Sequence, residues 1–289
     1  MISQTFAAIL WMSGAIVSFS SMAVAGRAIS FELDTFEIMM YRSFVGFAIV
    51  LAVASATGHL GNVTKRHLGT HAIRNLSHFA GQNLWFYALT VIPLAQVFAL
   101  EFTSPLWAIA LSAIVLGERI TRTRGIAALI GFIGILIVAR PSPDSLNVGQ
   151  LAAALAAIGF AGSAVFTRKL TRSETITCIL FYLTLMQAVF GIIAAGYDGD
   201  VALPSAQSVP WLVLIAVAGL VAHFCLTTAL KLAPATVVMP IDFIRLPLIA
   251  VIGMLLYAEA LDPWVFLGAA VIFGANYLNI RAEMPRNPK

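Results

Sequence analysis

The chain has 289 residues, of which 60% are hydrophobic and only 10% are charged. A soluble domain carries about 25% charged residues and could not hide so much apolar surface from water. The composition therefore excludes a soluble globular protein and indicates an integral membrane protein. The formal net charge is +4. We interpret the basic residues as topology markers beside membrane spans, so we expect no nucleic-acid partner.

Apolar runs long enough to cross a membrane recur along the chain. A transmembrane helix needs about 17–25 mostly apolar residues. Ten such runs occur, at 6–25, 36–55, 72–91, 93–116, 124–139, 148–167, 176–195, 209–230, 233–257 and 264–280. Stretches such as 126–139 are apolar throughout, which excludes the alternating strands of a membrane β-barrel. The predicted fold class is an all-α integral membrane protein with ten transmembrane helices.

The first run and the two cysteines have simple interpretations. Residues 23–25 imitate a signal-peptide cleavage site, but no lysine or arginine precedes Trp11. A signal peptide begins with a basic region, so we expect the first run to stay in place as a helix. Cys178 and Cys225 lie in different halves of the chain without metal-ligand spacing. We interpret them as small apolar side chains, and we predict neither a metal nor a cofactor.

The basic residues predict the orientation. Lysine and arginine collect in cytoplasmic loops. With ten spans and the amino terminus inside, most of the 17 basic residues lie in inside loops or at the adjoining span ends. The outside loops hold only Arg27 and Arg140, and they carry the acidic residues Glu32, Asp34, Asp144, Asp198, Asp200 and Asp262. Both termini are therefore predicted to be cytoplasmic.

The two halves of the chain resemble each other. An ungapped shift of 141 positions brings Tyr41 onto Tyr182, Pro93 onto Pro234, Glu101 onto Asp242, Phe102 onto Phe243 and Glu118 onto Glu259. Each half holds five spans, so the second half must enter the membrane from the opposite side. We predict two inverted five-helix repeats, residues 1–141 and 142–289. This organisation is typical of secondary carriers, and a duplicated scaffold without transport activity is the alternative.

One motif in each half resembles a known family. Residues 88–120, which end in "SAIVLGERI", and the following "GIAALIGFIGILIV" are similar to the EamA-type repeat of the drug/metabolite transporter (DMT) superfamily. The second copy spans 229–261, where Tyr257-Ala258-Glu259 departs from the usual Leu-Gly-Glu. The resemblance covers nearly the whole chain and implies ten helices, an inverted repeat, a central cavity and alternating access. It implies no single substrate, because relatives handle amino acids, S-adenosylmethionine, nucleotide sugars and other solutes.

Charged residues inside spans are the first candidates for a site, because each costs about 3 kcal/mol on insertion scales. Four are embedded, namely Arg42, Glu101, Asp242 and Arg245. We interpret Arg245 as a group that binds a substrate carboxylate or phosphate, and Glu101 or Asp242 as a group that binds an amine or titrates during transport. The alternative is a set of structural ion pairs, in which Arg42 pairs with Glu101.

Polar and aromatic residues add further candidates. His78, Gln82, Trp85 and Tyr87 follow one another along the third span, and His223 aligns with Gln82 under the 141-residue shift. These residues are candidates for substrate binding, and a histidine for proton relay. Hydrogen bonds between helices are the alternative for each of them.

Prolines and two glutamates are expected to shape the helices. Pro105, Pro240 and Pro247 fall inside the fourth and ninth spans, so these helices should kink or open there. Glu118 and Glu259 lie at loop edges, where we expect them to be architectural charge partners.

Taken together, the sequence predicts a secondary active transporter of the bacterial inner membrane. It would move a small polar or zwitterionic metabolite, an amino acid or amino-acid derivative, by alternating access. Uptake of S-adenosylmethionine or another larger metabolite is one alternative, and a non-transporting membrane partner protein is another. No Walker loop, GxGxxG or HExxH motif points to an enzyme. The expected partners are the substrate and the lipid bilayer, with protons as a candidate coupling ion and a homodimer as a candidate assembly.

Overall fold

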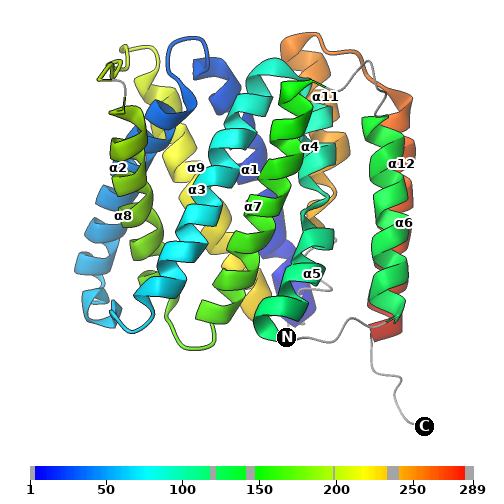
Figure 1. Cartoon of the computed structure of the whole chain (residues 1–289), viewed down its shortest axis with the longest axis horizontal. Helices are drawn as coiled ribbons and strands as arrows, with labels where there is room; N and C mark the ends of the chain where they lie inside the picture. Colours follow the sequence, from blue (N-terminus) through cyan, green and yellow to red (C-terminus); the bar gives the residue numbers. More distant parts are fainter. Residues whose placement is uncertain (1–3, 118–121, 141–146, 198, 233–240, 284–289) are drawn as a thin grey trace.

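The computed structural model describes residues 4–117, 122–140, 147–197, 199–232 and 241–283 (Figure 1). These residues form helices without any strand, as predicted. The helices are α1 (Gln4–Ile29), α2 (Thr35–Ala56), η1 (Leu60–Asn62), α3 (Leu68–Val91), α4 (Leu94–Glu101), α5 (Ser104–Leu116), α6 (Arg122–Ala139), α7 (Val148–Leu170), α8 (Ile176–Ala195), α9 (Val209–Leu232), α11 (Arg245–Tyr257) and α12 (Pro263–Glu283). Five residues singled out by the sequence lie outside the described residues, namely Glu118, Asp144, Asp198, Pro234 and Pro240.

Six stretches of the described residues are long and apolar enough to cross a membrane, namely Phe6–Ile29, Thr35–Ala56, Leu94–Leu116, Val148–Leu170, Ile176–Ala195 and Val209–Ala229. Shorter apolar helices cover Gly125–Val138, Arg245–Tyr257 and Pro263–Ala275. The remaining long helix, α3, carries the polar side chains described below. A membrane protein with several spans is therefore confirmed, and the number ten stays a prediction.

Two segments are broken at equivalent positions. A turn at residues 102–103 separates α4 from α5, and a turn at 243–244 precedes α11. Pro105 lies in the first turn of α5, where a missing backbone N–H costs no helical hydrogen bond. Pro247 is the third residue of α11, so it also lies in the first turn of its helix. The predicted openings therefore occur at the start of the second piece of each segment.

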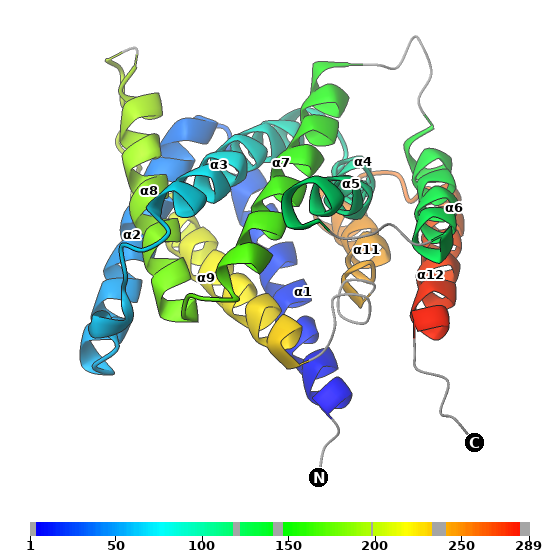
Figure 2. The ribbon, with the colours of Figure 1, turned by 60° about the horizontal axis from the view of Figure 1, so that its bottom comes forward.

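Helices from the two halves pack against each other in pairs. In both views α2 lies beside α8, and α6 lies beside α12 at the opposite edge (Figures 1 and 2). Between them, α1 packs along α9, α3 along α7, and α4 against α11. A shift of 141 residues converts the α1–α9 contact into the α7–α3 contact, which is the relation expected of two related halves.

Glycines allow the closest of these approaches. A Cβ atom at Gly159 of α7 would lie only 2.8 Å from the Cα atom of Gly81 and from the carbonyl oxygen of Ser77 on α3. The α6–α12 pair has the same feature, because a Cβ at Gly268 would lie 2.5 Å from the carbonyl oxygen of Gly134. Small residues of this kind let helix backbones meet inside a membrane.

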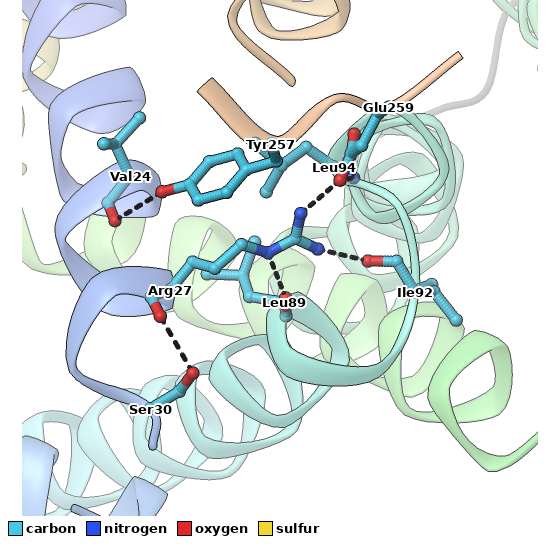
Figure 3. Close-up of polar contacts among 8 residues, drawn as sticks. All are labelled: Val24, Arg27, Ser30, Leu89, Ile92, Leu94, Tyr257 and Glu259. Carbon is cyan, nitrogen blue, oxygen red and sulfur yellow. Dashed lines mark hydrogen bonds and ion pairs between the residues drawn. The ribbon is translucent and has the colours of Figure 1, made fainter. Parts of the chain in front are cut away.

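An ion pair closes the end of the bundle that was predicted to face outside (Figure 3). Arg27, near the end of α1, pairs with Glu259, which follows α11. The same guanidinium donates to the carbonyl oxygens of Leu89 (2.7 Å) and Ile92 (2.5 Å) at the end of α3. Glu259 accepts the N–H of Leu94 at the start of α4, at 3.1 and 3.2 Å. We call this arrangement the Arg27–Glu259 latch.

The latch satisfies backbone groups that helix ends leave without partners. It joins α1, the α3–α4 corner and the end of α11, and the Arg27 Cζ atom lies 5.0 Å from the centre of the Tyr257 ring. The Tyr257 hydroxyl donates to the carbonyl oxygen of Val24 on α1 at 3.1 Å. The expectation that Glu259 is an interhelix charge partner is therefore confirmed.

A second contact at this end joins two loops. The Glu32 carboxylate accepts hydrogen bonds from the Ser208 hydroxyl and from the backbone N–H and hydroxyl of Ser205. These bonds, that of the Ser208 hydroxyl foremost, lower the pKa of Glu32, so the carboxylate stays charged at neutral pH.

Substituting Gly159 with alanine should lower thermal stability, because the new methyl group forces α7 away from α3. Overpacking of this kind typically costs about 1–3 kcal/mol. The measurement is thermal unfolding of purified protein in detergent. Gly131→Ala is the matched control, since nothing lies within 4 Å of a Cβ there and alanine favours the helix. A Gly159→Ala protein as stable as the control would disprove the close approach.

Arg27→Gln should destabilise the protein by about 3 kcal/mol, because it leaves Glu259 nearly buried without its cation. The control is Arg140→Gln, which removes another ion pair, with Asp262, in which Arg140 is 53% exposed. An exposed pair contributes at most about 1 kcal/mol. Unfolding of both variants in the same detergent measures their loss of stability. Equal losses would mean that the Arg27–Glu259 latch stabilises the protein no more than the exposed Arg140–Asp262 pair does.

Candidate functional site

Four predicted site residues meet at the helix breaks. The guanidinium Nη2 of Arg245 lies 2.5 Å from Asp242 Oδ2 and 3.1 Å from Glu101 Oε1. Trp85 of α3 donates from its indole Nε1 to Glu101 Oε2 at 2.8 Å. Because Glu101 ends α4 and Arg245 begins α11, the two broken segments place these charges opposite each other. We call Glu101, Asp242, Arg245 and Trp85 the break cluster.

Phenylalanine rings surround the guanidinium of this cluster. The Arg245 Cζ atom lies 4.8 Å from the ring centre of Phe19, 5.2 Å from that of Phe98 and 5.3 Å from that of Phe102. Cations over aromatic faces are stabilised, most of all where water is excluded. Sequence reasoning missed these residues, because a phenylalanine in an apolar span carries no signal of its own.

The break cluster contains two carboxylates and one guanidinium. Asp242 Oδ1 and Arg245 Nε are buried and have no hydrogen-bond partner among the described residues. If both acids are ionised, one negative charge is in excess, which a low-dielectric interior strongly disfavours. The cluster can therefore take up one proton or one cationic group.

Two histidines form a second group beside it. The rings of His78 on α3 and His223 on α9 lie 5.1 Å apart, edge to face. Nδ1 of His78 lies 3.4 Å from the Ser163 hydroxyl, whereas its Nε2 atom and the Oε1 atom of Gln82 have no partner among the described residues. We call His78, Gln82 and His223 the histidine cluster. Phe19 connects the two groups, since its ring centre lies 5.8 Å from that of His223 as well as close to Arg245.

Arg42 is buried next to the histidine cluster without an acidic partner in the part of the chain that the structure describes. Among the described residues, the hydrogen-bond partners of its Nη1 atom are the sulfur atoms of Met22 and Met39, both at 3.9 Å. The guanidinium lies against Gly219, where a Cβ would be 3.0 Å from Nη2. The alternative in which Arg42 pairs with Glu101 is wrong, because Glu101 is held by Arg245 and Trp85.

A small cavity touches both Arg42 and His223, and its wall also includes Thr184 and Gln187 of α8. It measures about 10 Å³, which is room for about one water molecule. A metabolite cannot fit into this space. The described conformation is therefore closed around these groups.

Tyr87 lies apart from the other predicted site residues. Its side chain is 39% exposed and borders a surface groove of about 250 Å³ that Phe36 and Thr90 also line. The prediction placed it in the site because it follows Trp85 along α3. The helix, however, turns its side chain toward the start of α2.

Three buried polar residues were not predicted as part of a site. Arg74 donates to Asn75 Oδ1 (2.7 Å) and to the Thr167 hydroxyl (3.0 Å), and Gln187 Nε2 donates to the Asn75 carbonyl oxygen (2.8 Å). Arg74 is one of the basic residues predicted to lie in inside loops or at the adjoining span ends, yet it is buried. Its spacing of four residues from His78 was the available signal, since such pairs share a helix face.

The comparisons with known proteins agree on a family. The model of the EamA-like transporter family matches the chain twice, at residues 6–140 and 147–281. A riboflavin transporter of Brucella anthropi is 34% identical over 221 residues, 75% of this chain and 78% of that protein. A riboflavin transporter of Rhizobium johnstonii is 30% identical over 99% of this chain and 95% of its own length. An S-adenosylmethionine uptake transporter of Rickettsia bellii is 27% identical over 94% and 93%.

A solved crystal structure shares the fold. It superposes with a TM-score of 0.70 over 96% of this chain and 98% of its own, at 19% identity. The double match of the family model, the transporter relatives and the apolar helices lead to one conclusion. The chain belongs to the EamA-like transporter family and is a multi-pass protein of the bacterial inner membrane.

Proposed function

We propose that this protein is a secondary carrier for a metabolite that combines a heteroaromatic ring with an anionic group, with S-adenosylmethionine as the first candidate. The observation that carries the proposal is Arg42, a buried guanidinium without a carboxylate partner among the described residues, beside a cavity and aromatic rings.

The ring is suggested by the relatives and by the lining of the site. Riboflavin and S-adenosylmethionine both carry a fused nitrogen heterocycle, and the relatives are named for these two compounds. Phe19, His78, His223 and Phe160 form a chain of neighbouring rings with centres 5.1–6.1 Å apart. Aromatic faces and edges of this kind bind flat heterocycles well.

The anionic group of the proposed substrate is inferred from the free-energy cost of burying the Arg42 guanidinium. A buried cation without a partner is strongly unfavourable in a membrane protein unless a ligand neutralises it. S-adenosylmethionine carries a carboxylate that can do so, whereas riboflavin carries no charge at neutral pH. As an amino-acid derivative, S-adenosylmethionine also falls within the class that the sequence predicted. Riboflavin is the second candidate, because a relative named for it is 34% identical to this chain.

The excess carboxylate of the break cluster suggests how transport is coupled. We assign the uptake of one positive charge, a proton or the cationic part of the substrate, to Asp242, whose Oδ1 atom has no partner in the described part of the chain. Arg245 then holds Glu101 and Asp242 at a fixed separation while that charge comes and goes.

The proposed cycle is alternating access between two inverted halves, residues 1–141 and 142–289, with both termini cytoplasmic. Three observations support it. The broken segments are related by the 141-residue shift, the latch closes one end, and the cavity is too small for substrate. Binding therefore requires rearrangement of the helices, and the turns at 102–103 and 243–244 are suitable hinges.

Counterflow in proteoliposomes tests the substrate. Vesicles with purified protein are loaded with unlabelled S-adenosylmethionine, riboflavin or an amino acid, and entry of the same labelled compound is followed. Saturable counterflow with S-adenosylmethionine supports the proposal. Counterflow with riboflavin alone would contradict the proposal that the substrate carries an anionic group. Exchange of amino acids alone would contradict the proposal that the substrate carries a heteroaromatic ring. No exchange with any compound would contradict the carrier.

Arg42→Met should raise the KM for S-adenosylmethionine about 10–100-fold, since a hydrogen bond to a charged group contributes about 1.5–3 kcal/mol. Arg42→Lys should recover part of the loss because it keeps the charge. Arg140→Gln, which removes an exposed arginine, is the control. An unchanged KM in folded Arg42→Met protein would show that Arg42 has a purely structural role.

Asp242→Asn should abolish uptake driven by a proton gradient, because the neutral amide cannot take up the coupling charge. If the coupling charge is a proton, Asp242→Asn protein should still exchange substrate when the pH is equal on both sides of the membrane. Arg245→Ala should abolish both activities. The measurements are uptake with and without an imposed pH gradient, and exchange at equal pH. Gradient-driven uptake at the wild-type rate in Asp242→Asn protein would contradict the assignment.

A further inference from the structure

Three side chains with metal-binding atoms converge at the end of the bundle opposite the latch. His71 belongs to the first turn of α3, Glu174 to the turn before α8, and Cys178 to the first turn of α8. One ligand atom from each lies within 4.8 Å of the others. No metal was predicted, because Cys178 and Cys225 show no metal-ligand spacing, and His71 stands about a hundred residues from Glu174 and Cys178.

The spacing suits one transition metal ion. His71 Nε2 and Cys178 Sγ lie 3.9 Å apart. Zinc binds nitrogen at about 2.0–2.1 Å and sulfur at about 2.3 Å with tetrahedral angles, which puts the two atoms about 3.6 Å apart. A shift of a few tenths of an ångström therefore brings both into range. The carbonyl oxygen of Thr64, 3.8 Å from Cys178 Sγ, borders the same space.

The imidazole of His71 lacks the partners that a buried ring normally has. His71 is 0% exposed, and its Nδ1 atom has no hydrogen-bond partner among the described residues. Among the described residues, its Nε2 atom has one hydrogen-bond neighbour, the sulfur of Cys178 at 3.9 Å. Buried polar atoms are almost always hydrogen-bonded, so a ring with this one weak contact in the described part of the chain can still take a further partner.

The carboxylate supplies the negative charge. Burial raises the pKa of Glu174, but hydrogen bonds, first from the Thr64 hydroxyl, outweigh this and lower the pKa below its usual range. The Thr64 hydroxyl lies 2.8 and 2.9 Å from the two carboxylate oxygens and holds the group in place. An anionic oxygen is thus fixed beside a thiol and an imidazole.

We propose that His71, Glu174 and Cys178 bind a divalent transition metal ion of the zinc type. A thiolate, an imidazole and a carboxylate together favour zinc or cobalt over magnesium or calcium, which prefer oxygen ligands alone. The ion would join the start of α3 to the start of α8 and to the loop that carries Thr64. It can enter beside the exposed residues 171–173. The proposal does not depend on the transported substrate.

Cobalt binding to purified, tag-free protein in detergent under reducing conditions tests this site. Addition of Co²⁺ should produce a cobalt–thiolate charge-transfer band together with the visible bands of tetrahedral cobalt, and Zn²⁺ should abolish both. Cys178→Ser should lose the charge-transfer band. The matched control is Cys225→Ser, because Cys225 packs with Ala8, Met12 and Ala15 in an apolar cluster and should leave the band unchanged.

His71→Ala should weaken cobalt binding by at least about tenfold, as even outer-shell partners of a metal contribute about 10–100-fold. If His71→Ala protein does not fold, protection of the Cys178 thiol by Zn²⁺ against maleimide is measured instead. Zn²⁺ should slow maleimide labelling of Cys178 in Cys225→Ser protein. Wild-type protein without a charge-transfer band, a band that survives in Cys178→Ser protein, or labelling unaffected by Zn²⁺ would each overturn the proposal.

Discussion

A charged side chain inside a membrane must find its partner within the protein, because the lipid offers none. Arg27 and Arg245 meet this requirement with carboxylates, and Arg27 also binds carbonyl oxygens that helix ends leave exposed. The two ion-paired arginines therefore hold helices from different halves together. Arg42, in contrast, has two methionine sulfurs as its nearest polar partners. The same physical rule that explains the ion pairs makes this exception the most informative residue of the interior.

The broken helices explain how the charges of the break cluster come together. A continuous helix offers only side chains, whereas a break at residues 102–103 or 243–244 also brings a helix end to this depth. Glu101 and Arg245 occupy those ends and face each other. Trp85 and the phenylalanine rings then exclude water from the pair. The ion pairs of the break cluster therefore lie beside the turns at 102–103 and 243–244.

Much of the architecture could be predicted from the sequence, because it depends on the order of residues along the chain. The apolar runs gave the helices, and Pro105 and Pro247 indicated where segments would open. What the sequence could not supply is which helix faces which. A pair between Arg42 and Glu101 was one alternative, and Tyr87 was predicted to share a site with Trp85, but rotation about each helix axis decides both. The pairing of α3 with α8 likewise determines that His71 meets Cys178, and no spacing in the sequence contains that information.

The cavity beside Arg42 has room for about one water molecule, and this has a consequence for leakage. In the described conformation, the space beside Arg42 is too small for a continuous file of water past this residue. Under the proposed cycle, an ion would then cross at this place only when the helices rearrange. The rate of leakage would be tied to the rate of that rearrangement. Tight packing around Arg42 would thus help to keep the membrane sealed while the protein rests.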